Sequence, residues 1–188
     1  MGDNVWSAQS SNRLSWFLNT WIYSPGNLFR GLLSIWPARE GHNGILLAKS
    51  GLEVICCDRS PQSLEKVREV ALQSGVKVKT WQIDLEIPGN DPLPENFYGG
   101  ILVFRYLNRP LIPCMTKALR EGGLIVYETF TVDQLRFGKP HNPNFLLRHG
   151  ELESCFGDYE IIHSFEGIKV DPERAIAQIV ARKPISIG

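Results

Sequence analysis

Two acidic residues stand where predicted strands end, and from such a position a carboxylate can hold a polar ligand. Asp58 closes the run Leu52 to Cys57 and follows Gly41 by 17 positions. An acid that ends a strand about twenty residues after a glycine-containing turn is placed to accept hydrogen bonds from ribose hydroxyls. Asp84 ends the next predicted strand, where it can orient an adenine amine while Leu85 packs on the ring. The alternative is that both acids are ordinary residues of turns and strand ends.

A second group of polar side chains follows two strongly apolar runs. Residues 100–104 and 124–127 are apolar in succession, which indicates strands buried on both faces of a parallel sheet. Such sheets bind ligands at the carboxyl ends of their strands, so the residues that follow are expected at one rim. Exposed Arg and Glu at strand ends are more often solvated surface. Four residues are nevertheless candidates to position a substrate, and no catalytic role is assigned: Arg105, Tyr106, Glu128 and Arg136.

The order of elements predicts a doubly wound α/β sheet with a C-terminal antiparallel hairpin. Helices are expected over 41–50, 60–75, 107–119 and 146–156, and strands over 52–58, 76–84, 100–104, 124–128, 159–164 and 175–182. Alternating polarity in residues 76–83 places that strand near a sheet edge. Only about ten residues separate the last two strands, too few for a crossover helix, so they are expected to pair antiparallel. The long connection 132–148 is of a length that is often functional.

The composition is that of an ordinary globular domain. The 188 residues carry 20 Lys and Arg against 20 Asp and Glu. This balance gives no electrostatic indication of a nucleic-acid partner or an anionic membrane. The four cysteines form no Cys-x-x-Cys pair and have no histidine at metal-ligand spacing, so we expect reduced thiols and no metal site. Reduced thiols, with no secretion signal or membrane span expected, predict a cytoplasmic protein. The oligomeric state is not predicted.

The first 36 residues are rich in aromatic side chains. Leu14, Phe17, Leu18, Trp21 and Ile22 fall on one helical face, which predicts a helix that covers the sheet. A lid over a bound ligand is the alternative. The expected organisation is one domain over 1–188, with an N-terminal helical cover in 1–36 and an α/β core in 37–188.

From about Gly41 to the C-terminus the chain resembles the class I S-adenosylmethionine-dependent methyltransferases, especially the small single-domain branch similar to tellurite-resistance methyltransferases. The residues that carry the resemblance are 40–43, 54–61 and 82–85 and, most specifically, 104–107, 122–131 and 136–140. The resemblance implies a Rossmann-like sheet, S-adenosyl-L-methionine as cofactor and methyl transfer to an unidentified small molecule. It also implies cofactor contacts from a set of strand-end residues: Gly41, Asp58, Arg59, Asp84, Leu85, Phe104 and Arg105.

The first motif departs from this family, which has a first strand ending in an acid and then a glycine loop whose N–H groups reach the cofactor carboxylate. Here Pro37 has no N–H, and Arg39 stands where an earlier glycine is expected. Either residues 32–36 are an eroded first strand, or that strand is missing. The helical spacing of Leu28, Leu32, Ile35 and Trp36 favours a missing strand. The departure predicts poor or no cofactor binding, unless Arg39 pairs with the carboxylate instead.

Two other functions stay open. The altered motif also suits a methyltransferase-like protein that binds a partner without catalysis, or a truncated variant. A nicotinamide-dependent oxidoreductase would share the ribose acid. The expected C-terminal hairpin and the lack of a Gly-x-Gly-x-x-Gly loop disfavour that activity.

Overall fold

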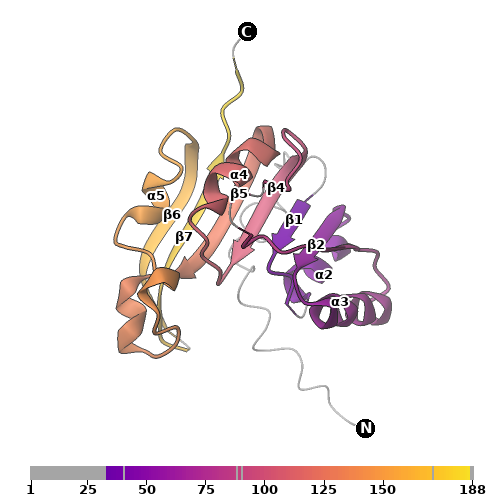
Figure 1. Cartoon of the computed structure of the whole chain (residues 1–188), viewed down its shortest axis with the longest axis horizontal. Helices are drawn as coiled ribbons and strands as arrows, with labels where there is room; N and C mark the ends of the chain where they lie inside the picture. The colour runs from indigo at the N-terminus through magenta and orange to yellow at the C-terminus, as the bar shows by residue number, and fades with distance from the viewer. Residues whose placement is uncertain (1–32, 40, 88, 90, 171, 187–188) are drawn as a thin grey trace.

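A computed structural model describes residues 33–39, 41–87, 89, 91–170 and 172–186 (Figure 1). The helix expected around Leu14 to Ile22 lies outside these residues. Within them, seven strands form one sheet: β1 (Leu33–Trp36), β2 (Val54–Asp58), β3 (Lys79–Gln82), β4 (Tyr98–Phe104), β5 (Leu119–Phe130), β6 (Glu160–Lys169) and β7 (Arg174–Arg182). Their order is β3-β2-β1-β4-β5-β7-β6. The first five strands are parallel, and β7 is antiparallel to both β5 and β6. The predicted fold class is therefore confirmed.

Helices cover both faces of the sheet. Their bounds, with two short 3-10 segments, are α2 (His42–Lys49), α3 (Pro61–Gln73), α4 (Leu111–Ala118), η2 (Val132–Arg136), η3 (Pro143–Phe145) and α5 (Glu151–Ser154). Leu47 of α2 and Val67 of α3 pack in the same apolar cluster as Cys56. Met115 of α4 and Leu152 of α5 pack in a second cluster with the neighbouring Cys57. Because successive strand residues face opposite sides, these clusters mark the two faces of a doubly wound sheet. Figure 1 shows α2 and α3 beside β1 and β2, and α5 beside β6.

The interpretation that the first strand is missing is wrong. Leu33–Trp36 is β1, and it pairs in parallel with β2 on one side and β4 on the other. Its neighbours determine this outcome, because a strand between two others gains backbone hydrogen bonds on both edges and leaves neither neighbour open. The alternative of a strand within residues 32–36 is confirmed, and residues 33–36 belong to the sheet rather than to an N-terminal helical cover.

Local signals place most other elements correctly. Ser60 caps α3, where Ser60 Oγ accepts a hydrogen bond from the Ser63 amide at 3.2 Å. The edge position of β3 and the antiparallel pairing of the strands that carry Ile161 and Ile179 are also confirmed. The helix expected over 146–156 shortens to α5, because Leu147 bridges to Thr131 as extended chain.

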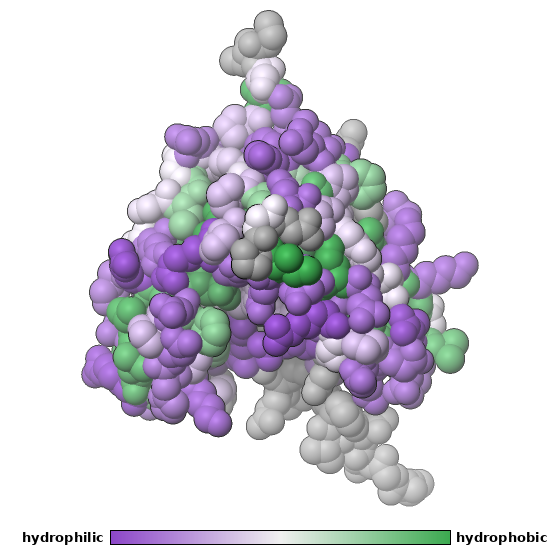
Figure 2. Space-filling model, in the orientation of Figure 1, coloured by the Kyte–Doolittle hydropathy of each residue, from purple (hydrophilic) through white to green (hydrophobic). Residues whose placement is uncertain are grey.

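The surface in Figure 2 is mostly hydrophilic, with apolar residues gathered in smaller areas. All four cysteines lie in the described part of the chain, and none of them forms a disulfide there. Among the described residues, no helix has the length and apolar character that crossing a bilayer requires.

Candidate functional site

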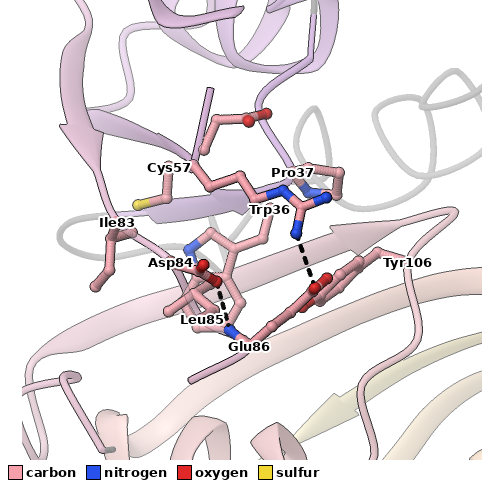
Figure 3. Close-up of a pocket in the computed structure, with 10 residues that line it drawn as sticks. Trp36, Pro37, Cys57, Ile83, Asp84, Leu85, Glu86 and Tyr106 are labelled. Atoms are coloured by element: carbon pink, nitrogen blue, oxygen red, sulfur yellow. Dashed lines mark hydrogen bonds and ion pairs between the residues drawn. The ribbon is translucent and has the colours of Figure 1, made fainter. Parts of the chain in front are cut away.

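The strand order reverses between β1 and β4, and two cavities open at the carboxyl ends of the strands there. The first cavity, of about 200 Å³, lies over the ends of β1, β2 and β3 (Figure 3). The second cavity, of about 560 Å³, lies over the ends of β4 and β5 and under the segment 139–145. Both are lined by Glu86 and Tyr106, so these two residues form the junction between them.

Asp58 lines the first cavity, with both carboxylate oxygens held by backbone N–H groups. Its Oδ2 accepts from the Arg39 amide at 3.1 Å, and its Oδ1 accepts from the Ser60 amide at 2.9 Å. Each oxygen of an ionised carboxylate can accept about two hydrogen bonds. Asp58 is therefore fixed in orientation and keeps acceptor capacity for a ligand with two hydroxyl groups.

Three consecutive residues after β3 form another wall of the first cavity. Asp84 Oδ1 accepts from the Glu86 amide at 2.9 Å, and the Leu85 carbonyl accepts from Asn108 Nδ2 at 3.2 Å. Glu86 also pairs with Arg59 at 2.9 Å, but the two side chains are 48% and 66% exposed. Such a solvated pair contributes little to stability.

Trp36 ends β1 where the resemblance leads one to expect an acid. Its side chain is only 1% exposed, and in Figure 3 it lies between Cys57 and Ile83 on one side and Tyr106 on the other. Its indole Nε1 has no hydrogen-bond partner in the described part of the chain. A buried donor without an acceptor is costly, and at the wall of a cavity it points to a ligand or water that accepts from it.

In the loop after β1, the described backbone N–H groups already donate hydrogen bonds to other groups of the protein. The Ala38 amide donates to the Cys57 carbonyl, the Gly41 amide to the Ala38 carbonyl, and the Arg39 amide to Asp58. Pro37 has none. The Arg39 side chain lines the second cavity, and its Nη2 donates to the Arg105 carbonyl at 3.2 Å. Any anion bound beside this loop would therefore meet the Arg39 guanidinium rather than a row of loop amides.

Gly41 lines neither cavity. It has a positive φ of 79°, and a Cβ at this position would lie 3.0 Å from Val67 Cγ2. Gly41 therefore allows the start of α2 to pack closely against the side of α3.

Two arginines at the site hold the left-handed backbone conformation that glycine usually adopts. The φ angles are 48° for Arg39 and 53° for Arg105, and each costs on the order of 1 kcal/mol for a residue with a Cβ. The Arg105 guanidinium carbon lies 5.6 Å from the centroid of the Phe130 ring. Because strained backbone persists where surrounding contacts impose it, its presence at both arginines supports a functional role for this junction.

Tyr106 is the aromatic residue at the junction. Its hydroxyl accepts from Asn108 Nδ2 at 3.4 Å, and its carbonyl accepts from the Tyr127 hydroxyl at 2.9 Å. Burial raises the pKa of Tyr106 to about 12, against the opposing effect of the Asn108 hydrogen bond. The side chain is therefore a neutral phenol at physiological pH and can orient a ligand but not act as a strong base.

Two residues that were not predicted from the sequence hold the wall of the second cavity in place through hydrogen bonds and an ion pair. Gln134, buried in η2, donates to the Lys139 carbonyl at 3.1 Å and accepts from the Ala175 amide at 2.9 Å. Arg109 donates to the carbonyls of Asn144 and Leu146 and forms an ion pair with Glu151. Gln134 carries no local signal in the sequence. Arg109 follows the predicted strand 100–104 by five residues, but its partners are 35 to 42 residues away.

Several of the predicted site residues are not at a cavity wall. Phe104 is buried in the core, and Arg136 stacks 5.9 Å from the Phe137 ring. Glu128 is 2% exposed and accepts from Gln178 Nε2 at 2.5 Å. The structure brings together six of the predicted residues along the two cavities: Asp58, Arg59, Asp84, Leu85, Arg105 and Tyr106. Within the described ranges, no group of three or more His, Cys, Asp or Glu side chains is arranged to hold a metal.

Neither a protein-family model nor a curated protein matches the sequence significantly. Solved structures do match. TehB from Haemophilus influenzae has a TM-score of 0.69 and 19% identity, over 94% of this chain and 68% of that one. A SAM-dependent methyltransferase from Methanosarcina mazei has a TM-score of 0.64 and 13% identity, over 83% and 93%. Geranyl diphosphate methyltransferase has a TM-score of 0.66 and 14% identity, over 90% and 77%. At these identities the likeness concerns the fold: this chain has the class I methyltransferase fold that the sequence predicted.

Proposed function

We propose that this chain binds S-adenosylmethionine in the first cavity and transfers its methyl group to a small-molecule acceptor in the second cavity. The observation that carries the proposal is the junction: two cavities at the switch point of a methyltransferase fold meet at Tyr106 and Glu86. Methyl transfer requires a donor and an acceptor in line and in contact, and two cavities that share a wall provide that geometry.

The residues of the first cavity fit the adenosine part of the cofactor. Asp58 has acceptor capacity left for the two ribose hydroxyls, since each of its oxygens accepts one backbone N–H. Leu85 supplies an apolar surface for the adenine ring, with the Asp84 carboxylate beside it. The indole N–H of Trp36 is a buried donor in the same wall that an acceptor atom of the ligand would satisfy.

Arg39 would hold the carboxylate of the cofactor. The described loop amides are already used by the protein, so this task falls to a side chain. Arg39 follows β1 and lines the second cavity, where its Nη2 donates to the Arg105 carbonyl. A guanidinium can bind a carboxylate through two parallel hydrogen bonds. This proposal takes the alternative in which Arg39 replaces the glycine loop, against the expectation of poor or absent cofactor binding.

When bound, the cofactor supplies an electrophilic methyl group on a positively charged sulfur. The chain's own contribution is to position and to exclude water. Tyr106, as a neutral phenol at the junction, orients the acceptor toward the first cavity, and Leu107 and Phe130 give it apolar contacts. The rate enhancement then comes from proximity and orientation.

Titration calorimetry of the whole chain tests the proposal, with S-adenosylmethionine, S-adenosylhomocysteine and NAD as ligands. We expect saturable binding of the first two and none of NAD. Asp58→Ala should weaken S-adenosylhomocysteine binding by about 1.5 to 3 kcal/mol, the range for hydrogen bonds to a charged group. The matched control is Asp158→Asn, an exposed acid that lines neither cavity, which should bind as the wild type does.

Other results would replace the proposal with a different function. Binding of NAD alone would favour the oxidoreductase. Binding of the methionine cofactors with normal affinity in a folded Asp58→Ala variant would remove Asp58 from the site. Absence of binding to all three would leave a protein with a methyltransferase fold that acts by another activity.

A further inference from the structure

The strand β6 leaves one edge of the sheet open. It stands last in the strand order, and its paired neighbour is β7. In the described part of the chain, no backbone hydrogen bond outside that pairing involves residues 160–162 or 164–169. Every residue of β6 is at least partly exposed, whereas seven of the nine residues of β7 are buried. Most of the N–H and C=O groups along the outer edge of β6 are therefore accessible to another strand.

The opposite edge of the sheet is protected by its shortness. The strand β3 has only four residues, against ten in β6. Short edge strands and charged side chains are two means by which proteins prevent strands of different molecules from pairing. Because β6 is long, its charges decide whether it pairs and with which partner.

The two terminal residues of β6 carry opposite charges on the same face of the sheet. Glu160 lies opposite Arg182 of β7 and pairs with it at 3.0 Å, yet the Glu160 side chain is 62% exposed. Lys169 lies opposite Arg174, which is an even number of positions from Arg182 and so on the same face. The Lys169 ammonium lies 4.4 Å from the centroid of the Phe165 ring, and no described carboxylate forms an ion pair with it. These ends are complementary to a second β6 that runs in the opposite direction.

An antiparallel pair of β6 strands about a two-fold axis at Phe165 uses this complementarity twice. Lys169 is four positions after Phe165, and Glu160 is five positions before it. The β-bulge between Ile161 and His163 adds one residue to that half of the strand, so Glu160 of one copy lies opposite Lys169 of the other. Because a two-fold axis repeats every contact, the dimer contains two such pairs.

The middle of β6 fits the same register. Glu166 lies opposite Ser164 of the second copy, so no two like charges meet. Ile168, which is 47% exposed, lies opposite Ile161, and this gives an apolar pair across the two strands. A register that placed Glu166 opposite Glu166 would bring two carboxylates together and is disfavoured.

We propose that two copies of this chain associate through β6 into a symmetric dimer, in which one sheet continues across both molecules. The charges that would repel many other strands have opposite signs in this register, so they select a second copy of the same chain. The proposal is independent of methyl transfer, because no residue of β6 lines either cavity.

Sedimentation velocity of the whole chain over a series of concentrations tests the proposal. We expect a monomer–dimer equilibrium with a dissociation constant on the order of 10 μM, since two paired edge strands form an interface of the small, transient class. Lys169→Gln should weaken the dimer about threefold, and Lys169→Glu at least about tenfold, because the second change adds repulsion at both symmetric pairs. The controls are Lys77→Gln and Lys77→Glu, which change an exposed lysine just before β3.

A charge exchange identifies the partner of Lys169. The two residues of one chain are about 30 Å apart, at roughly 3.3 Å per residue, so they cannot contact each other. The double variant Glu160→Lys with Lys169→Glu should therefore regain most of the wild-type association, and only through contacts between two molecules. Circular dichroism checks that each variant is folded, and Lys169→Gln keeps the test valid if Lys169→Glu does not fold.

Three results would overturn the proposal. The first is a wild type that stays monomeric over the whole series. The second is a dimer that neither Lys169 variant weakens, or that Lys77→Glu weakens as much, since the interface would then lie elsewhere. The third is a folded double variant that associates no better than Lys169→Glu.

Discussion

The two halves of the site are built differently. At the first cavity, the strands β1 to β3 are short, and the ion pair of Arg59 with Glu86 is largely solvated. The described amides of the loop after β1 already donate hydrogen bonds to other groups of the protein. Over β4 and β5, the wall is fastened from inside by Arg109 and Gln134. The Arg109 and Glu151 side chains are only 37% and 19% exposed. The comparison teaches that the proposed acceptor side is held by contacts between distant segments, whereas the proposed cofactor side depends on a few positions where the backbone is tightly constrained.

The largest expected effect is at Gly41, on the cofactor side. Gly41→Ala adds a Cβ at 3.0 Å from Val67 to a residue with a positive φ, so strain and overpacking act together. We expect a loss of about 3 kcal/mol in the free energy of unfolding, measured by urea denaturation. Gly51→Ala is the matched control, because Gly51 has a φ of 82° and open space around it. Its loss should be about 1 kcal/mol, and equal losses in the two variants would show that Gly41 is not a packing residue.

The next largest expected effect is a difference in stability between variants of two ion pairs, Arg109 with Glu151 and Arg59 with Glu86. Arg109→Met removes the pair with Glu151 and two hydrogen bonds to carbonyls, so unfolding should become easier by about 2 kcal/mol. Arg59→Met removes a solvated pair and should change stability by less than about 0.5 kcal/mol. Urea denaturation of both variants checks this difference. Similar losses would mean that the acceptor side is no better fastened than the cofactor side.

A smaller effect of the same contact appears with pH. The hydrogen bond from Arg109 lowers the pKa of Glu151. A carboxyl whose pKa is lowered by folding stabilises the protein above its unfolded value, about 4.3 for Glu, and this stability is lost as the pH falls through the folded value. The urea midpoint of the wild type should therefore fall more steeply from pH 5 to pH 3 than that of Arg109→Met. Parallel slopes would remove this pair from the acid sensitivity, and Lys77→Gln should follow the wild type.

Local patterns in the sequence predicted where the two acids lie. Asp58 is the last residue of β2, Asp84 lies two residues after β3, and both line the first cavity. A strand end is a local property of the sequence. The strand β1 could not be predicted in this way, because its four residues are held by β2 and β4 rather than by their own pattern.

The contacts that hold the proposed acceptor side in place could not be predicted from the sequence either. Gln134 and Arg109 act through partners about 40 residues away, and no spacing in the sequence reports such a contact. Glu128 was expected at the rim because it follows an apolar run, yet its side chain turns to Gln178 within the sheet. Strand ends thus predict where a site lies, but not which of their side chains face it.

The claim that Arg39 replaces the glycine loop is tested most directly by the affinity of S-adenosylhomocysteine for Arg39→Gln. This change keeps a polar, flexible side chain, but it shortens that side chain and removes its charge. Arg68→Gln, on the exposed side of α3, is the control. We predict micromolar binding to the wild type and to the control, and about tenfold weaker binding to Arg39→Gln. No saturable binding to the wild type, or equal or tighter binding to Arg39→Gln, would contradict the account and show that the altered loop obstructs the cofactor.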